Sequence, residues 1–233
     1  MRMSGNMVLI TGGATGIGFA MAKSLHAAGN EVIICGRRQR RLDEAAAALP
    51  GIHMIRADVT DDDDRQHLLA EISSNYPALN VLINNAGIQK DVDLADADAV
   101  IADESEIAVN LEAPIVMSAL FTPLLAGKAN ATIVNVSSAL AFMVERATRC
   151  PIYCATKAGL HAFCIAQRIQ LQPLGIRVVE IIPPAVESEL NMESRVKRGF
   201  VTSPYMLSAD DFVAAAFSQM ADDADEIRVN MKR

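Results

Sequence analysis

The chain lacks tryptophan, has few aromatic residues, and shows no cysteine or histidine pattern that would hold a metal ion. Aromatic residues make up 4% of its 233 residues. The four cysteines are Cys35, Cys150, Cys154 and Cys164. No two of them have C-x-x-C spacing and no histidines cluster beside them. We therefore expect no metal site, and we interpret the thiols as small core residues.

We expect neither a membrane span nor a leader segment. The first six residues are too short and polar for a signal peptide, and no apolar run approaches the ~20 residues of a membrane span. A net charge of -7 argues against a general polyanion-binding surface. We therefore expect a cytoplasmic protein without nucleic-acid or membrane partners. A local arginine cluster can still bind a single phosphate.

Apolar residues are abundant and regularly arranged. They make up 51% of the chain, against 21% charged residues, which is enough for one large core. β-Branched runs predict strands at 7–10, 31–35, 53–57, 80–83, 132–136, 176–182 and 226–229. Helical spacing predicts helices at 17–28, 39–49, from 60 onward, and at 104–126, 151–172 and 209–220. This alternation predicts an α/β fold: a single Rossmann-type doubly wound parallel sheet over residues 1–233, flanked by helices on both faces.

Three local features qualify this outline. Residues 187–207 show no clean period and are long for a connection, which predicts a mobile substrate lid. The acidic run 61–64 opens a helix, where carboxylates favour the positive end of the dipole, and we prefer this explanation to a metal site. Pro114 and Pro123 predict that the helix at 104–126 bends or restarts.

A glycine-rich turn links the first strand to the first helix. It runs from Thr11 to Gly18, with glycines at Gly12, Gly16 and Gly18. Glycines let the backbone approach a pyrophosphate, whose charge is received by free N–H groups at the helix start. The spacing departs from the common G-x-G-x-x-G pattern. The prediction of a dinucleotide site therefore depends on the position of the turn between the first strand and the first helix of an alternating fold.

The end of the second strand indicates which dinucleotide fits. An NAD site expects an acidic residue there for the ribose 2′-hydroxyl, whereas this chain has Gly36-Arg37-Arg38. Arg37 can pair with a 2′-phosphate through its planar guanidinium, which favours NADP(H) over NAD(H). The alternative is that Arg37 and Arg38 are solvated residues ahead of a helix.

Polar residues also follow the third and fourth strands. Asp58 can accept a hydrogen bond from an adenine amino group, although a helix-capping role is equally physical. The run Asn84-Asn85-Ala86-Gly87 lies beside the expected dinucleotide site, where asparagines can bridge loops and Gly87 allows close approach to a ribose.

The predicted catalytic residues gather around the helix at 151–172. Tyr153 and Lys157 are four residues apart and share one face, so the ammonium group can favour the phenolate form of the tyrosine. Ser138 ends the fifth strand and can hold a substrate oxygen, with Ser137 as the alternative. Asn110 can support the lysine or a relaying water. Cys150 and Cys154 flank the tyrosine, which leaves open an oxidation-sensitive thiol.

These motifs, in this order, resemble the classical short-chain dehydrogenase/reductase family over nearly the whole chain. The resemblance implies an NADP(H)-dependent oxidoreductase acting on a carbonyl or alcohol. It implies Tyr153 as general acid or base, Lys157 as its electrostatic partner and ribose ligand, Ser138 as the group orienting the substrate oxygen, and Asn110 as the last member of the relay. It also implies a homodimer or homotetramer. The residues expected to contact the cofactor are Gly12, Thr15, Gly16, Ile17, Gly18, Arg37, Asp58, Val59, Asn85, Ala86, Gly87, Tyr153, Lys157, Pro183, Val186 and Ser188.

Two departures from the family pattern stand out. Pro183-Pro184 replaces the usual Pro-Gly after the sixth strand, which stiffens the loop before Val186 and Ser188. The segment between Ser138 and Tyr153 is about two residues longer than usual, and the C-terminal end is short. These features are similar to the DltE-like subgroup of bacterial oxidoreductases. A non-catalytic NADP(H)-binding sensor or scaffold on the same fold is the alternative function.

Overall fold

The structure is a computed structural model, and it describes residues 2–97, 100, 105–190, 192–197, 199 and 206–229. Its centre is a parallel sheet in the order β3-β2-β1-β4-β5-β6-β7. The strands are β1 (Met7–Thr11), β2 (Glu31–Gly36), β3 (His53–Arg56), β4 (Val81–Asn84), β5 (Thr132–Val136), β6 (Arg177–Ile182) and β7 (Glu226–Arg228). The order reverses direction between β1 and β4, and ligands bind at such a point outside the carboxyl ends of the strands.

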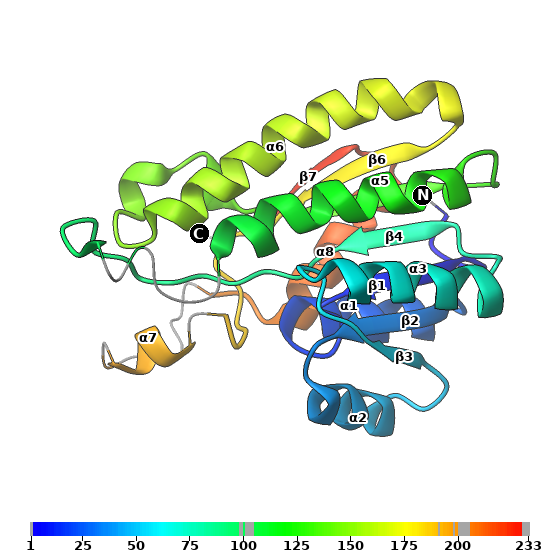
Figure 1. Ribbon diagram of the computed structural model, residues 1–233, viewed down its shortest axis with the longest axis horizontal. Helices are drawn as coiled ribbons and strands as arrows, with labels where there is room; N and C mark the ends of the chain where they lie inside the picture. Colours follow the sequence, from blue (N-terminus) through cyan, green and yellow to red (C-terminus); the bar gives the residue numbers. More distant parts are fainter. Residues whose placement is uncertain are drawn as a thin grey trace.

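Helices cover both faces of the sheet (Figure 1). One face carries α1 (Gly16–Ala27), α2 (Gln39–Ala48) and α8 (Ala209–Ala221). The other carries α3 (Asp62–Asn75), α5 (Ala113–Leu125) and α6 (Pro151–Leu171). Each face has its own apolar cluster, because alternate residues of the strands point to opposite sides. The predicted doubly wound architecture is confirmed.

The helix that leads into α5 differs most from the prediction. Residues 101–104 lie outside the described part of the chain, so the predicted start at 104 falls there. The π-helical turn η1 (Ala108–Glu112) precedes α5, and Pro114 occupies the first turn of α5. Glu112 and Ala113 have helical backbone angles, so η1 and α5 form one continuous helix. The helix therefore does not restart at Pro114, and α5 continues through Pro123 to Leu125; the irregularity is the π-helical turn just before Pro114.

One stretch is more apolar than the sequence analysis allowed. Ala108–Leu125 has the length and composition of a membrane span, with a mean hydropathy of 1.5. Met117, Phe121 and Leu125 on this stretch are buried in the apolar cluster beneath the sheet. Packing between the sheet and its neighbouring helices accounts for this apolar character, as in a core helix.

The start of α3 corrects two expectations. The helix begins at Asp62 rather than Thr60, because Asp61 is its N-cap and accepts a 2.9 Å hydrogen bond from the backbone N–H of Asp64. Capping is thus a role of Asp61 and not of Asp58. Asp62, Asp63 and Asp64 then occupy the first turn, as the dipole argument predicts.

Candidate active site

A cleft of about 510 Å³ lies at the carboxyl ends of the central strands. Every residue predicted to contact the cofactor lines it, and Ser138 lines it as well. Asn110 is the exception among the predicted site residues, because it is fully buried behind the cleft wall. The structure therefore brings together residues from Gly12 to Ser188 at the topological switch point of the sheet.

The glycine turn forms one wall of the cleft and requires glycine at two positions. Gly12 has φ +64°, a left-handed conformation that side chains disfavour. A Cβ at Gly18 would lie 2.3 Å from the carbonyl oxygen of Gly12. Thr15, the N-cap of α1, makes no side-chain cap hydrogen bond. The first N–H groups of α1 are therefore available to an anion, and the turn fits the pyrophosphate of a dinucleotide.

The loop after β4 supports the glycine turn. The side-chain amide of Asn85 donates to the carbonyl oxygens of Thr11 and Gly12, at 3.0 and 3.2 Å. The Thr11 hydroxyl accepts from the backbone N–H groups of Asn85 and Ala86, both at 3.0 Å. Asn85 therefore shapes the phosphate turn from behind, which agrees with the predicted bridging of loops by asparagines.

Three arginines surround the end of the cleft near β2. Arg37, Arg38 and Arg41 all line it. Arg41 pairs with Glu189 at 2.5 Å, and Arg38 pairs with the same carboxylate at 3.4 Å. Sequence reasoning missed Arg41 and Glu189. The signal that could have found Arg41 is its place in the first turn of α2, directly after the Arg37-Arg38 pair that ends the β2 connection.

Asp58 lies opposite these arginines. Its carboxylate accepts from the backbone N–H and the hydroxyl of Thr60, at 2.9 and 2.7 Å. Burial acts to raise the pKa of Asp58, but the two Thr60 hydrogen bonds and the charges of Arg37 and Arg65 hold it below its usual value. Asp58 is therefore a charged acceptor at the rim of the cleft.

Asn110 is the fully buried member of the predicted catalytic set. It lies in the π-helical turn η1, a local rearrangement that often occurs at functional sites. Its side chain accepts from the backbone N–H of Ile88 at 2.9 Å and donates to the carbonyl oxygen of Ile88 at 2.8 Å. It thereby fixes the loop that follows Gly87, and it also donates to the Thr156 hydroxyl at 3.3 Å.

The two adjacent serines have different partners. The Ser137 hydroxyl donates to the carboxylate of Glu180 at 2.5 Å. The Ser138 hydroxyl accepts from the backbone N–H of Leu140 at 3.1 Å and shares a hydrogen bond with Tyr153. Of the two serines, Ser138 thus lies next to the phenol.

Tyr153 and Lys157 face the cleft from α6. The Lys157 ammonium group donates to the carbonyl oxygen of Val136 at 2.8 Å and lies 5.7 Å from the centre of the Tyr153 ring. Burial lowers the pKa of Lys157 from 10.5 to about 8, while Cys164 and Glu180 act in the opposite direction. The ammonium form still predominates at neutral pH.

The pKa of Tyr153 shifts in the direction opposite to the one predicted. Burial raises it above the usual value, and the hydrogen bond with Ser138 only partly counteracts this effect. The reason is that desolvation disfavours the phenolate more than the surrounding groups stabilise it. The free protein therefore holds the proton on Tyr153, the state that a proton donor requires.

The described cysteines are all reduced and buried. Burial raises the pKa of Cys35 to about 12 and that of Cys154 to about 11, and it also raises the pKa of Cys150. A raised pKa disfavours the reactive thiolate. Packing beside Tyr153 is therefore the role that the structure shows for Cys150 and Cys154.

The segment after β6 closes the cleft on its last side. Pro183, Val186 and Ser188 line the cleft, and Val186 pairs with Leu207 in an isolated β-bridge. The short helix α7 (Met192–Lys197) lies between them, while residues 191, 198 and 200–205 of the predicted lid lie outside the described residues. The two ends of the segment 187–207, the predicted lid, are thus held together by backbone pairing.

Comparison with known proteins agrees with this geometry. Residues 6–199 match the sequence profile of the short chain dehydrogenase family. The chain is 48% identical over 200 residues to the uncharacterized oxidoreductase DltE of Bacillus subtilis (strain 168), covering 85% of this chain and 79% of DltE. Its fold resembles a short-chain dehydrogenase from Sphingobium yanoikuyae in complex with NADPH, with TM-score 0.82, 27% identity, and coverage of 95% and 87%.

A second solved structure shares the fold alone. It is a short chain dehydrogenase/reductase from Burkholderia phymatum in complex with NAD, with TM-score 0.83, 20% identity, and coverage of 97% of this chain and 89% of that one. The profile match covers most of the chain, and the DltE match confirms the expected subgroup. The chain therefore belongs to the short-chain dehydrogenase/reductase family of oxidoreductases and is similar to DltE.

Proposed function

We propose that this chain is an NADP(H)-dependent oxidoreductase that interconverts a carbonyl compound and an alcohol, with Tyr153 as the general acid or base. The observation that supports this most strongly is the position of Tyr153 in the cleft. Its buried phenol shares a hydrogen bond with Ser138 and lies on the same helix face as the ammonium group of Lys157. A proton donor and a polar group for the substrate oxygen thus lie side by side.

The glycine turn and the arginines support a phosphorylated dinucleotide. Gly12 and Gly18 let the turn pack closely against Ala86 and against its own backbone, and the uncapped N-terminus of α1 could receive a pyrophosphate. Arg37, Arg38 and Arg41 offer guanidinium groups at the far end of the same cleft, where a 2′-phosphate would lie. When bound, the reduced nicotinamide supplies the hydride. The fold relative bound to NADPH supports this choice by analogy.

The residues of this chain would divide the reduction between them. The Ser138 hydroxyl orients the carbonyl oxygen, and Tyr153 transfers its proton to that oxygen as the carbonyl carbon receives the hydride. The product is the alcohol, and Tyr153 is left as phenolate. Lys157 stabilises that negative charge, and Asn110 keeps the loop after Gly87 in place through Ile88. In the reverse direction Tyr153 accepts the proton.

Residues 187–207 would form a lid over the substrate. Ser188 and Leu190 line the cleft, and the segment returns to the sheet at Leu207 through its bridge with Val186. Such a loop can exclude water from the reacting atoms. We also propose a homodimer or homotetramer, on the strength of the family resemblance.

The test measures whether the protein reduces any of a panel of carbonyl compounds with NADPH. Turnover is monitored as the loss of NADPH absorbance at 340 nm. Aldehydes, ketones and quinones are compared with a no-substrate control, and NADPH binding is measured separately by its fluorescence, which no tryptophan obscures. Binding accompanied by turnover of at least one carbonyl supports the proposal. Binding without turnover on any of them supports the sensor or scaffold alternative.

A further inference from the structure

A fully buried carboxylate interrupts the apolar run of strand β6. Glu180 has no solvent exposure, and Val178, Val179, Ile181 and Ile182 around it are buried too. Central parallel strands are normally continuous apolar runs, because both faces are covered by helices. Burying a carboxylate is costly unless hydrogen bonds and positive charges compensate it. The Glu180 carboxylate is therefore better explained by a specific function than by stability.

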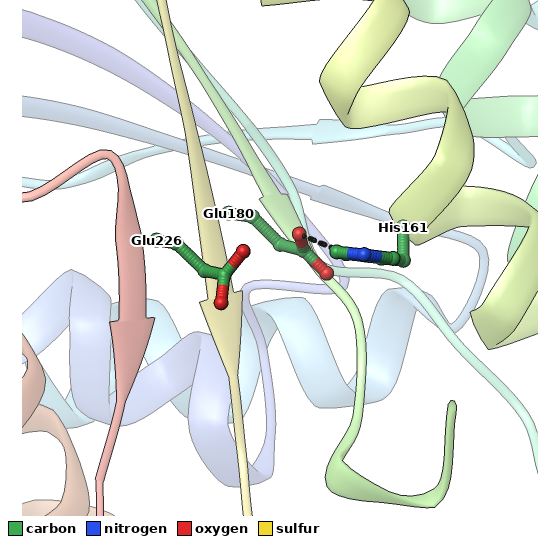
Figure 2. A group of neighbouring side chains, drawn as sticks. All are labelled: His161, Glu180 and Glu226. Carbon is green, nitrogen blue, oxygen red and sulfur yellow. Dashed lines mark hydrogen bonds and ion pairs between the residues drawn. The ribbon is translucent and has the colours of Figure 1, made fainter. Parts of the chain in front are cut away.

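Both oxygens of the carboxylate have partners. Oε1 accepts from the Ser137 hydroxyl at 2.5 Å, and Oε2 lies 2.8 Å from Nδ1 of His161. Figure 2 shows the Glu180 carboxylate between the His161 ring and Glu226. The Glu180–His161 pair is thus built into the protein between β6 and helix α6.

These partners belong to the two elements that carry the active site. Tyr153, Lys157 and His161 are spaced by four residues along α6, so they follow one another along one helix face. Ser137 lies between Val136, whose carbonyl oxygen binds the Lys157 ammonium group, and Ser138. Glu180 therefore joins the carboxyl end of β5 to the helix turn that follows Lys157.

His161 extends this connection to the loop after Ser138. Its ring makes an edge contact with Phe142, at a centroid distance of 4.6 Å. Phe142 lies just after the short 3-10 turn Ala139–Ala141 that follows Ser138. The loop is thereby anchored to the same face of α6.

A metal ion is a less favoured explanation of the same cluster. His161, Glu180 and Glu226 offer ligand atoms that all lie within 4.8 Å of one another. However, Glu226 is paired with Arg228 at 2.7 Å, and the Glu180 oxygens are engaged by Ser137 and His161. A metal would have to displace an arginine and a serine hydroxyl. The contacts favour a hydrogen-bonded positioning network.

We propose that Glu180 is a positioning residue of the active site. Held by His161, it fixes the Ser137–Ser138 turn through the Ser137 hydroxyl and supplies the buried negative charge that faces Lys157. This inference rests on the proposed function, because it assigns Glu180 a role in the reaction that Tyr153, Lys157 and Ser138 would perform.

The charges around Lys157 agree with this role. The titratable groups that face it are Tyr153 and Cys164 on its own helix and Glu180 on β6, and His161 is paired with Glu180. From the side of the β4 loop, Gly87 and Asn110 approach without a charge. Burial lowers the pKa of Lys157 to about 8, and Cys164 and Glu180 oppose that shift. Removing the Glu180 charge should lower this pKa further.

The experiment compares Glu180→Gln with Glu226→Gln. Glutamine has the shape of glutamate without its charge, and Glu226 is the exposed register neighbour of Glu180 on β7, which makes it a matched control. The first readout is an NMR titration of the Lys157 side chain in ¹³C-lysine-labelled free protein, assigned with Lys157→Arg. The second is the pH profile of kcat with NADPH and the best carbonyl from the panel. Thermal unfolding and NADPH affinity verify that each variant is folded.

We expect Glu180→Gln to lower the pKa of Lys157 by roughly one unit and to move the alkaline limb of kcat by the same amount, a roughly fivefold loss at pH 8. Glu226→Gln should leave both readouts at wild-type values. A folded Glu180→Gln protein with an unchanged Lys157 titration overturns the proposal, even if kcat falls uniformly at every pH. The NMR readout needs no turnover, so the two proposals can fail separately. Absence of carbonyl reduction would refute the proposed function, while the Lys157 titration would still show whether Glu180 acts on the pKa of Lys157.

Two further measurements cover the remaining outcomes. If Glu180→Gln does not fold, Ser137→Ala is measured instead. A lower kcat at unchanged NADPH affinity supports the positioning role, and wild-type kcat overturns it. Calorimetric titration with ZnCl₂ tests the metal alternative. Zinc binding to the wild type that is lost in both Glu180→Gln and Glu226→Gln would replace the proposal with a metal site.

Discussion

The ammonium group of Lys157 donates a 2.8 Å hydrogen bond to the carbonyl oxygen of Val136, which ties helix α6 to the carboxyl end of strand β5. This single contact keeps a buried charge at the point where the cleft, the catalytic helix and the Ser137–Ser138 turn meet. A buried lysine is costly to the fold, so its presence is more readily explained by chemistry than by stability.

Lys157→Met should therefore stabilise the folded protein near pH 7. The folded-state pKa of about 8 lies below the unfolded value of 10.5, so the unfolded chain binds more protons between these values and wild-type stability rises with pH there. Below pH 8 the folded protein bears the full free-energy cost of burying the charged Lys157 side chain, about 3 kcal/mol. Loss of the bond to Val136 offsets about 1 kcal/mol of it. We expect a net gain of about 2 kcal/mol, measured by urea unfolding at pH 7.

The control for this prediction is the pH dependence of the difference between the two proteins. Above pH 9 Cys35 and Cys154, whose pKa values are raised by burial and not by Lys157, lower the stability of both proteins alike and cancel in the difference. The stability advantage of Lys157→Met should shrink from pH 8 to pH 10. A variant that is less stable than wild type at pH 7 would show that Lys157 is mainly structural.

Arg37→Ser should weaken NADPH binding and leave NADH binding nearly unchanged. A charge-assisted pair with the 2′-phosphate is worth about 2 kcal/mol, or roughly 30-fold in Kd. Titration of cofactor fluorescence measures both constants. Arg40→Ser is the matched control, because Arg40 lies three residues after Arg37 in the first turn of α2, pairs with Glu44 and is 77% exposed. Equal weakening of both cofactors by Arg37→Ser would contradict a 2′-phosphate role.

Glu189→Gln should strengthen NADPH binding. The Glu189 carboxylate pairs with Arg38 and Arg41 at the end of the cleft, where it would compete with a 2′-phosphate and repel it. Both pairs are at the surface, so the expected gain is modest, roughly threefold at low ionic strength. Fluorescence titrations at 20 mM and about 300 mM salt should show the gain shrinking with salt. No gain at low salt would argue that the phosphate lies elsewhere.

Gly18→Ala should destabilise the protein and weaken binding of either dinucleotide. The added Cβ would lie 2.3 Å from the carbonyl oxygen of Gly12, so the phosphate turn must move. Overpacking of this kind costs about 1–3 kcal/mol. Gly36→Ala is the control for stability alone, because a Cβ there meets no protein atom within 4 Å, whereas Gly36 itself lines the cleft. Thermal unfolding and NADPH titration of both variants decide the matter, and a fully stable Gly18→Ala protein with normal affinity would contradict the turn's proposed role.

The sheet and most residues of the cleft could be predicted from the sequence. Contacts that depend on tertiary packing could not. Strands such as Thr132–Val136 are apolar runs bounded by turns, and their local signal agrees with their buried environment. The family motif predicts a role for Asn110, but the partner of its side chain, Ile88, depends on a π-helical turn. No local pattern encodes that turn. The buried state of Tyr153, which raises its pKa, also depends on residues distant in the sequence.

Glu180 illustrates the same limit from another side. In the sequence it is one acidic residue inside the run 177–182, which only weakens a strand prediction slightly. Its proposed role can be inferred only from the folded structure, in which β5 and α6 bring Ser137 and His161 to its two carboxylate oxygens. Arg41 and Glu189 are likewise 148 positions apart and meet only because α2 and the segment after β6 border one cleft.

The most direct test of the proposed function is a single turnover of NADPH by Tyr153→Phe. The variant and wild type are each saturated with NADPH, mixed with the best carbonyl, and followed at 340 nm, with Tyr76→Phe as a control on a tyrosine far from the cleft. Phenylalanine keeps the ring and removes the proton donor, so NADPH affinity should stay within about twofold while the rate of NADPH oxidation falls by about 100-fold or more. Tyr76→Phe should behave as wild type. A Tyr153→Phe protein that oxidises NADPH at the wild-type rate would contradict the account.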